Sequence, residues 1–176
     1  MADRLERLVL DHHAGVYRYA FRLAGNAVDA DDLTQQTFLV AQEHASEIRD
    51  DAKAGAWLRT VLRNLYLRRR QRAPSLASDV DLALDAVAEP DSAAANWDAT
   101  SRFDGPLDAI FDRERLQRAL DALPDEFRVV LLMFYFEDLS YQEIADVLKI
   151  PIGTVMSRLS RAKAHLKQRL CDLART

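Results

Sequence analysis

Ser140-Tyr-Gln-Glu-Ile-Ala-Asp-Val-Leu-Lys-Ile-Pro-Ile-Gly-Thr-Val-Met-Ser-Arg-Leu159 is the stretch of sequence that decides the fold. Ser140 and Glu143 have the spacing of a capping box, which predicts that a helix begins there. Pro151 lies in a predicted turn, and Gly153 is expected to open a second helix. Two helices joined in this way form a helix-turn-helix, whose second helix lies in the major groove of duplex DNA.

The second helix of this unit has an apolar side and a polar side. At 100° per residue, four positions form one buried stripe: Val155, Leu159, Ala162 and Leu166. We expect DNA contacts from the remaining faces, where the candidates are Thr154, Met156, Ser157, Arg158, Ser160 and Arg161. Arginine can hydrogen-bond guanine with two donors. Residues 158–169 hold five Lys or Arg and no acid, a composition that suits phosphate contact.

Residues 1–72 predict three more helices. Apolar residues recur at helical spacing up to Leu23, and Gly25-Asn26 is a stop signal. Asp29 is expected to cap the second helix, which would run to about Ile48 and carry Leu33, Phe38, Leu39 and Ala41 as its apolar residues. A polar break over residues 49–53 precedes a third helix from about Ala54 to Arg72.

The net charge of −4 on 176 residues is distributed unevenly. Residues 73–112 have a net charge of −8, whereas residues 1–72 and 113–176 each have a net charge of +2. The acidic segment is also rich in Ala, Ser and Pro, which is a linker composition. We therefore predict an all-α protein in which two small helical domains, 1–72 and 113–176, are joined by a long acidic linker.

Several functional classes are excluded by composition. The single cysteine, Cys171, cannot form an internal disulfide or a cysteine cluster for zinc. No apolar run approaches the roughly 18 residues of a membrane span, and the N-terminus lacks the apolar stretch of a signal peptide. The four histidines have no metal-ligand spacing, and no catalytic constellation is visible. We expect a cytoplasmic protein with no membrane insertion, no enzyme active site, no metal and no cofactor.

The predicted third helix carries a second basic run. Arg59, Arg63 and four arginines between 68 and 72 follow one another without an acid, and Trp57 lies beside them. Cations next to an aromatic ring are the chemistry that holds and stacks unpaired bases. A purely structural role for Trp57, as part of the core, is equally consistent with the sequence.

Both halves of the chain resemble bacterial sigma factors of the extracytoplasmic-function (ECF) group of the sigma-70 family. The segment Asp29-Ala-Asp-Asp-Leu-Thr-Gln-Gln-Thr-Phe38, together with Tyr19–Asn26 and Ala56–Asn64, is similar to region 2 of that family. The stretch from Leu120 to Leu159 is similar to region 4. The acidic Gln-Thr-Phe segment combined with a C-terminal helix-turn-helix makes the resemblance specific.

The resemblance implies a function in transcription initiation. The chain would bind core RNA polymerase and direct it to promoters, with residues 1–72 as region 2 and residues 113–176 as region 4. The implied partners are the beta-prime clamp helices and the beta flap of the polymerase, promoter DNA and an anti-sigma factor. The residues that match the clamp-docking segment are Asp31, Asp32, Gln35, Gln36 and Phe38.

The two DNA elements would be divided between the domains. Residues from about 49 to 70 match the part that captures the minus-ten element, and the candidates there are Trp57, Arg59, Arg63 and Asn64. The helix-turn-helix would recognise the minus-thirty-five element as duplex. Three residues depart from the family pattern. The family often has Glu where this chain has Gln36, Gly where it has Lys149, and Arg or Lys where it has Met156.

Two other functions are compatible with parts of the sequence. A stand-alone helix-turn-helix regulator would explain the C-terminal unit but not the segment from Asp29 to Phe38. A helical adaptor that binds only protein would explain two small domains on an acidic linker.

The acidic linker has an implied role of its own if the chain is a sigma factor. As a polyanion, it would mimic RNA in the cleft of the polymerase.

Overall fold

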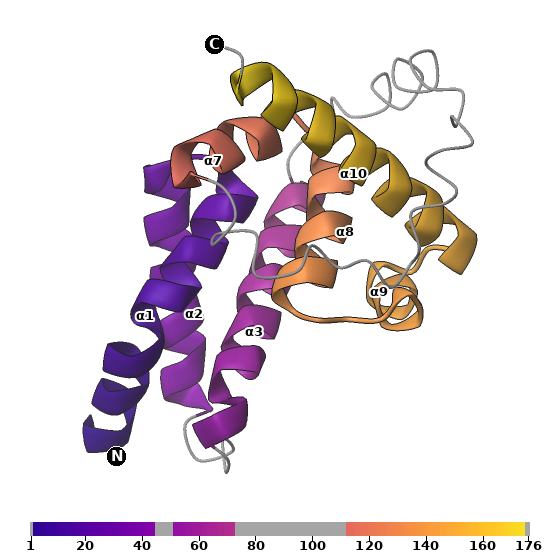
Figure 1. Cartoon of the computed structure of the whole chain (residues 1–176). Helices are drawn as coiled ribbons and strands as arrows, with labels where there is room; N and C mark the ends of the chain where they lie inside the picture. Colours follow the sequence, from indigo (N-terminus) through magenta and orange to yellow (C-terminus); the bar gives the residue numbers. More distant parts are fainter. Residues whose placement is uncertain (1, 45–50, 73–111, 175–176) are drawn as a thin grey trace. The chain divides into compact units, whose positions relative to one another are not determined.

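The structure of the protein is a computed structural model, and it describes residues 2–44, 51–72 and 112–174. Every regular element in these ranges is an α-helix (Figure 1). The predicted all-α fold class is therefore confirmed.

The chain divides into two compact units, residues 1–75 and 76–176. The predicted linker, residues 73–112, lies outside the described residues except for its last member. Asp112 is the N-cap of α7 (Arg113–Asp121), the first helix of the second unit that the structure describes, and its side chain accepts a hydrogen bond from the Glu114 N–H at 3.4 Å.

In its described part, the first unit is a bundle of three helices that contact one another (Figure 1). Helix α1 spans Ala2–Ala24, α2 spans Ala27–Glu43 and α3 spans Asp51–Arg72. The larger side chains of its core are fully buried, among them Tyr19, Leu23, Leu33, Leu58 and Leu62.

The N-cap of α2, which follows the turn after α1, is not the residue predicted from the sequence. Gly25 has φ 76°, the left-handed conformation that glycine adopts at little cost. Asn26 is the N-cap, and its Oδ1 accepts a hydrogen bond from the Asp29 N–H at 2.9 Å. The prediction that Asp29 caps this helix is wrong, because asparagine caps as well as aspartate and comes directly after the turn.

Three other predicted helix ends also differ from the structure. Helix α2 ends at Glu43 rather than near Ile48, which lies outside the described residues. Helix α3 begins at Asp51 rather than at about Ala54. Helix α10 begins at Ile152 rather than Gly153.

The second unit contains four helices in its described part. They are α7 (Arg113–Asp121), α8 (Asp125–Phe136), α9 (Tyr141–Leu148) and α10 (Ile152–Ala174). Helix α10 contacts each of the other three, which places it along one side of this unit (Figure 1). The core includes Leu116, Leu120, Leu131, Leu132, Met133 and Ile144.

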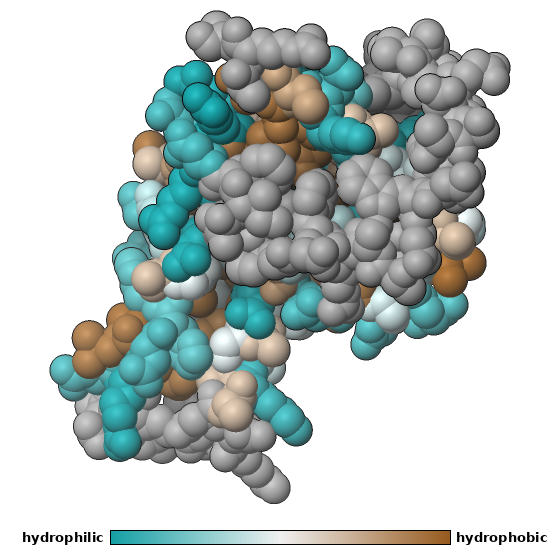
Figure 2. Space-filling view, in the orientation of Figure 1, coloured by the Kyte–Doolittle hydropathy of each residue, from teal (hydrophilic) through white to brown (hydrophobic). Residues whose placement is uncertain are grey.

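The visible surface of the described residues is mostly hydrophilic, with isolated brown patches of apolar side chains (Figure 2). Large apolar side chains that are exposed in the described part of the chain are Leu10, Val28, Leu39, Ile152 and Met156. Leu39 was expected on the apolar side of its helix, and its 54% exposure makes that expectation wrong.

Candidate nucleic-acid interface

The turn between α9 and α10 is held by local hydrogen bonds. Ser140 and Glu143 form the predicted capping box, in which the Ser140 N–H donates to Glu143 Oε2 at 2.8 Å. The Ser140 hydroxyl also donates to the same carboxylate at 2.7 Å. These bonds, the hydroxyl first and the backbone second, lower the pKa of Glu143 because they favour its charged form.

Lys149 ends α9 in the left-handed conformation, with φ 57° and ψ 41°. Its N–H donates to the carbonyl of Ala145. Pro151 then starts the next helix by accepting hydrogen bonds from the N–H groups of Thr154 at 3.0 Å and Val155 at 3.2 Å. The helix-turn-helix predicted from residues 140–159 is therefore present.

Helix α10 has the two sides that the sequence predicts. The residues of the predicted stripe are all at most 1% exposed: Val155, Leu159, Ala162 and Leu166. Among the candidate DNA contacts, the exposed side chains are Met156, Ser157, Ser160 and Arg161. Small polar groups, one thioether and one guanidinium thus lie together on a helix whose other side is anchored in the core.

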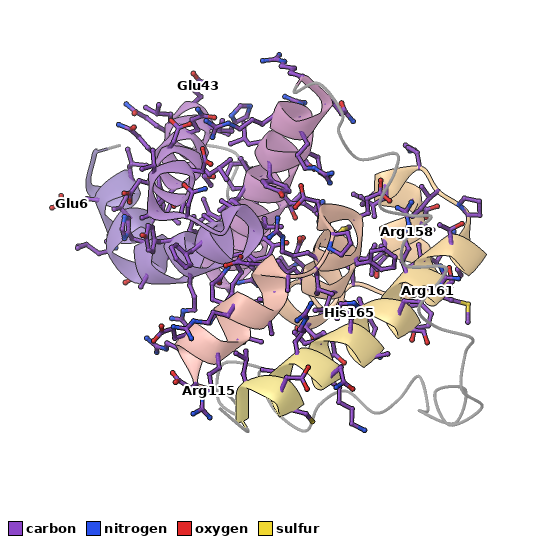
Figure 3. The ribbon with its side chains drawn as sticks, turned by 90° about the horizontal axis from the view of Figure 1, so that it is seen from above. Glu6, Glu43, Arg115, Arg158, Arg161 and His165 are labelled. Atoms are coloured by element: carbon purple, nitrogen blue, oxygen red, sulfur yellow. The ribbon has the colours of Figure 1, made fainter. Side chains whose placement is uncertain are left out.

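Arg158 and Thr154 lie at the edges of this exposed side and are half-buried. Nη2 of Arg158 contacts Oε2 of Glu126 at 2.9 Å, and Figure 3 shows Arg158 and Arg161 on the same helix. Glu126 belongs to α8 and was not singled out from sequence, because no local spacing relates it to α10. A guanidinium has five N–H donors, so Arg158 can keep this ion pair and still donate to phosphate.

Helix α10 also carries a buried cation, Lys163. Lys163 is 7% exposed, and its ammonium lies 5.0 Å from the ring centroid of Phe134 and 5.7 Å from that of Tyr135. Burial lowers the pKa of Lys163 because the charged form loses hydration. Burial, followed by the charge of Arg169, also lowers the pKa of His165.

The four minus-ten candidates on α3 do not share one exposed face. Trp57 is half-buried against the core residues Leu8 and Ala54. At 100° per residue, Asn64 lies on the same side as Trp57, and it is exposed. Arg59 and Arg63 lie together on another side, where Arg59 is half-buried and Arg63 is only 3% exposed.

The polymerase candidates on α2 lie mainly on its outer side. Asp31, Gln35 and Gln36 are exposed, and Asp32 is half-buried. Phe38 is half-buried and stacks on the ring of His13 of α1, with 6.0 Å between ring centroids. The outer side of α2 therefore carries acidic and amide side chains between residues 31 and 36.

Two exposed apolar residues on the same side of α2 were not predicted as contacts. Val28 is 79% exposed and Leu39 is 54% exposed. At 100° per residue they lie within about 20° of each other and between Gln35 and Asp32. Exposed apolar side chains surrounded by polar ones are typical of protein interfaces. The sequence signal is their position opposite the buried residues of the helix.

Arg69 of α3 forms ion pairs with two carboxylates of α2. Its Nη1 contacts Oδ2 of Asp32 at 3.0 Å, and its Nη2 contacts Oδ1 of Asp29 at 3.4 Å. Gln36 donates from its side-chain amide to Oδ2 of Asp32 at 3.2 Å. The acidic side of α2 is thus already partly neutralised by a cation of this chain.

In the described ranges, no group of three His, Cys, Asp or Glu side chains is arranged to hold a metal ion. Within the same residues, no helix has the length and apolar character needed to cross a bilayer.

Comparison with known proteins places both helical units in one family. The family described as "Sigma-70 region 2" matches residues 8–74, and "Sigma-70, region 4" matches residues 113–166. The ECF RNA polymerase sigma factor SigL of Mycobacterium tuberculosis is 36% identical over 174 residues, which cover 98% of this chain and 92% of SigL. The chain belongs to the ECF RNA polymerase sigma factors. The resemblance found in the sequence is confirmed.

Other relatives of this sigma factor agree with that assignment. SigW of Bacillus subtilis is 30% identical over 164 residues, covering 90% of this chain and 84% of SigW. SigE of Mycolicibacterium smegmatis is 35% identical over 172 residues, and the chain spans 61% of the length of SigE. The sigma factor RpoE of Bartonella quintana, solved with the anti-sigma factor NepR, has a similar fold, with a TM-score of 0.58 and 22% identity over 94% of this chain and 95% of RpoE.

Proposed function

We propose that this sigma factor binds core RNA polymerase and directs it to promoters, with its two helical domains performing separate tasks. Residues 1–72 form the domain for polymerase and the minus-ten element, and residues 113–176 form the domain for the minus-thirty-five element. The acidic residues 73–112 connect them. The observation that carries the proposal is that one chain combines regions 2 and 4 of the sigma-70 family, each in a helical unit with an exposed polar side.

The C-terminal domain recognises duplex DNA through α10. Ser157, Ser160 and Arg161 are exposed on the helix side opposite the core, and Met156 is exposed nearer its edge. Thr154 and Arg158 supply contacts from the edges of that side. Short side chains let the helix approach base edges, and Arg161 donates to guanine in the major groove.

The N-terminal domain contacts polymerase through the outer side of α2. Asp31, Asp32, Gln35, Gln36 and Phe38 dock on the beta-prime clamp helices, and the carboxylates match a basic partner surface. The exposed apolar residues of this helix add buried area at the contact.

The minus-ten element contacts α3 of the same domain. Trp57, Arg59 and Asn64 hold it there through stacking and charge. Arg63 was also a candidate, but at 3% exposure it is too buried to contact a strand on the surface of the helix.

The remaining partners follow from the family. The C-terminal domain also rests on the beta flap, and an anti-sigma factor blocks the polymerase-binding surfaces. The protein acts in the cytoplasm as a specificity subunit with no catalytic site, metal or cofactor of its own. The acidic linker occupies the RNA path of the polymerase until the transcript displaces it.

The test is copurification with core polymerase followed by mapping of transcription start sites. We expect a stable complex and a set of start sites that share upstream elements. The change Asp31→Arg should weaken the complex by about tenfold or more, because like charges then face the clamp. Asp11→Arg makes the same charge change at an exposed site of α1 and serves as the control. Absence of any complex with core polymerase would exclude the proposed function.

A further inference from the structure

A hollow of about 340 Å³ lies between α2 and α3 in the first unit. Its lining comes from Arg68, Arg69, Arg72 and Leu65 of α3 and from Gln36 of α2. Three guanidinium groups around one concave surface, with a neutral amide on the facing helix, make a site for an anion. Arginine side chains match phosphate oxygens with paired N–H donors.

One of the three arginines is occupied within the chain. Arg69 divides its guanidinium between Asp29 and Asp32, and its side chain is 49% exposed while those of the carboxylates are 45% and 39% exposed. Ion pairs that are so open to water are weak and exchange readily. A phosphate that enters the hollow therefore competes with two carboxylates for the same guanidinium.

We propose that this hollow binds a phosphate of the DNA backbone and that Asp29 and Asp32 occlude it in the free chain by holding Arg69. The proposal rests on the assignment of α3 to nucleic acid in the proposed function. Because Asp32 is also a proposed polymerase contact, a partner cation that pairs with Asp32 releases Arg69 toward phosphate. Linkage makes that coupling reciprocal, so a bound phosphate leaves Asp32 more available to the partner.

The test is the affinity of the full chain, without polymerase, for a fluorescein-labelled single-stranded DNA of mixed sequence, measured by anisotropy at low salt. Asp29→Asn and Asp32→Asn each remove one carboxylate from Arg69. Asp31→Asn makes the same charge change on the same helix, but position 31 is 100° from position 32 and turns away from α3. We expect the first two variants to bind about two- to fivefold more tightly than Asp31→Asn.

A second comparison isolates Arg69 itself. Arg69→Gln should weaken binding and reduce the magnitude of the slope of log affinity against log salt by about 0.7, the value for one phosphate on a single strand. The gain from Asp32→Asn should disappear in the double variant with Arg69→Gln. Asp29 is hydrogen-bonded to the N-cap residue Asn26, so Asp29→Asn could also alter the start of α2. Asp32 is not part of that cap, so the comparison of Asp32→Asn with its Arg69→Gln double variant tests the proposal independently of the helix start.

The result that overturns the proposal is equal affinity of Asp29→Asn, Asp32→Asn and Asp31→Asn, or a gain that persists without Arg69. The measurement needs no polymerase. If the chain fails to bind core enzyme, the proposed function is lost, and the phosphate site is still decided by these variants.

Discussion

The guanidinium of Arg158 lies 2.9 Å from the carboxylate of Glu126, and this ion pair fastens α10 to α8. The two side chains are 22% and 31% exposed, so the pair is shielded from water on most sides. It fixes the helix that carries the proposed DNA contacts against the hydrophobic helix of the same unit. Glu126 is therefore a positioning residue for α10.

Loss of this pair should loosen α10 without unfolding the unit. For Glu126→Gln we expect the free energy of opening of α10 amides to fall by about 1 kcal/mol, since the pair is only partly exposed. Hydrogen exchange followed by mass spectrometry measures this directly. Glu114→Gln removes a much more exposed carboxylate, on α7, and should leave α10 unchanged. Equal protection of α10 in both variants would contradict the positioning role.

Arg158 and Arg161 of α10 should differ in their effect on promoter recognition. Arg161→Ala should weaken binding to the minus-thirty-five duplex by about 1–3 kcal/mol, the cost of losing a bidentate contact to guanine. Arg158→Ala should cost less in binding and more in stability, because its guanidinium is shared with Glu126. Affinity of the holoenzyme for a promoter from the mapped start sites tests this order, and the reverse order would refute it.

One residue of the turn before α10 has an unfavourable backbone conformation, which a substitution can relieve. Lys149 has φ 57°, where a Cβ is unfavourable and glycine is not. We expect Lys149→Gly to raise the free energy of unfolding by about 1 kcal/mol in urea titrations followed by circular dichroism. Lys149→Ala removes the same charge but keeps the Cβ, and it should bring no such gain. A similar gain from both variants would assign the effect to the charge.

The buried ammonium of Lys163 predicts a pH-dependent stability. Since burial lowers its pKa below the ordinary 10.5, the folded protein binds this proton less tightly than the unfolded chain does. The charged Lys163 therefore lowers the free energy of unfolding, and this loss of stability is complete at pH values below the pKa of Lys163 in the folded protein. The loss disappears as the pH rises through that pKa toward 10.5, the ordinary value in the unfolded chain. Lys163→Met should therefore be more stable than the parent chain at pH 7, with an advantage that shrinks above the folded pKa.

The measurement for Lys163 is urea unfolding at several pH values between 7 and about 10.5. The exposed Lys167 of the same helix provides the control, and Lys167→Met should change stability by less than about 0.5 kcal/mol. The rings of Phe134 and Tyr135 offset part of the burial cost by attracting the cation. An advantage of Lys163→Met that does not vary with pH would show that the lowered pKa is not its cause.

Local chemistry explains which structural features were predictable. The capping box of Ser140 and Glu143 and the buried stripe that includes Val155 and Leu159 depend on residues a few positions apart, and both were predicted correctly. The N-cap of α2 was wrong, since Asn26 and Asp29 are both good caps and only the turn at Gly25 selects between them.

The sequence by itself determined the all-α class, the family and the face of α10 that turns outward, because helical periodicity and hydrogen bonds between near neighbours are encoded locally. Only the tertiary structure decided which charges meet. Arg158 with Glu126, and Arg69 with Asp29 and Asp32, join helices whose contact no spacing in the sequence specifies. The packing of apolar faces sets the positions of helices relative to one another within each unit, and only then do distant side chains come within the few ångströms over which ion pairs form.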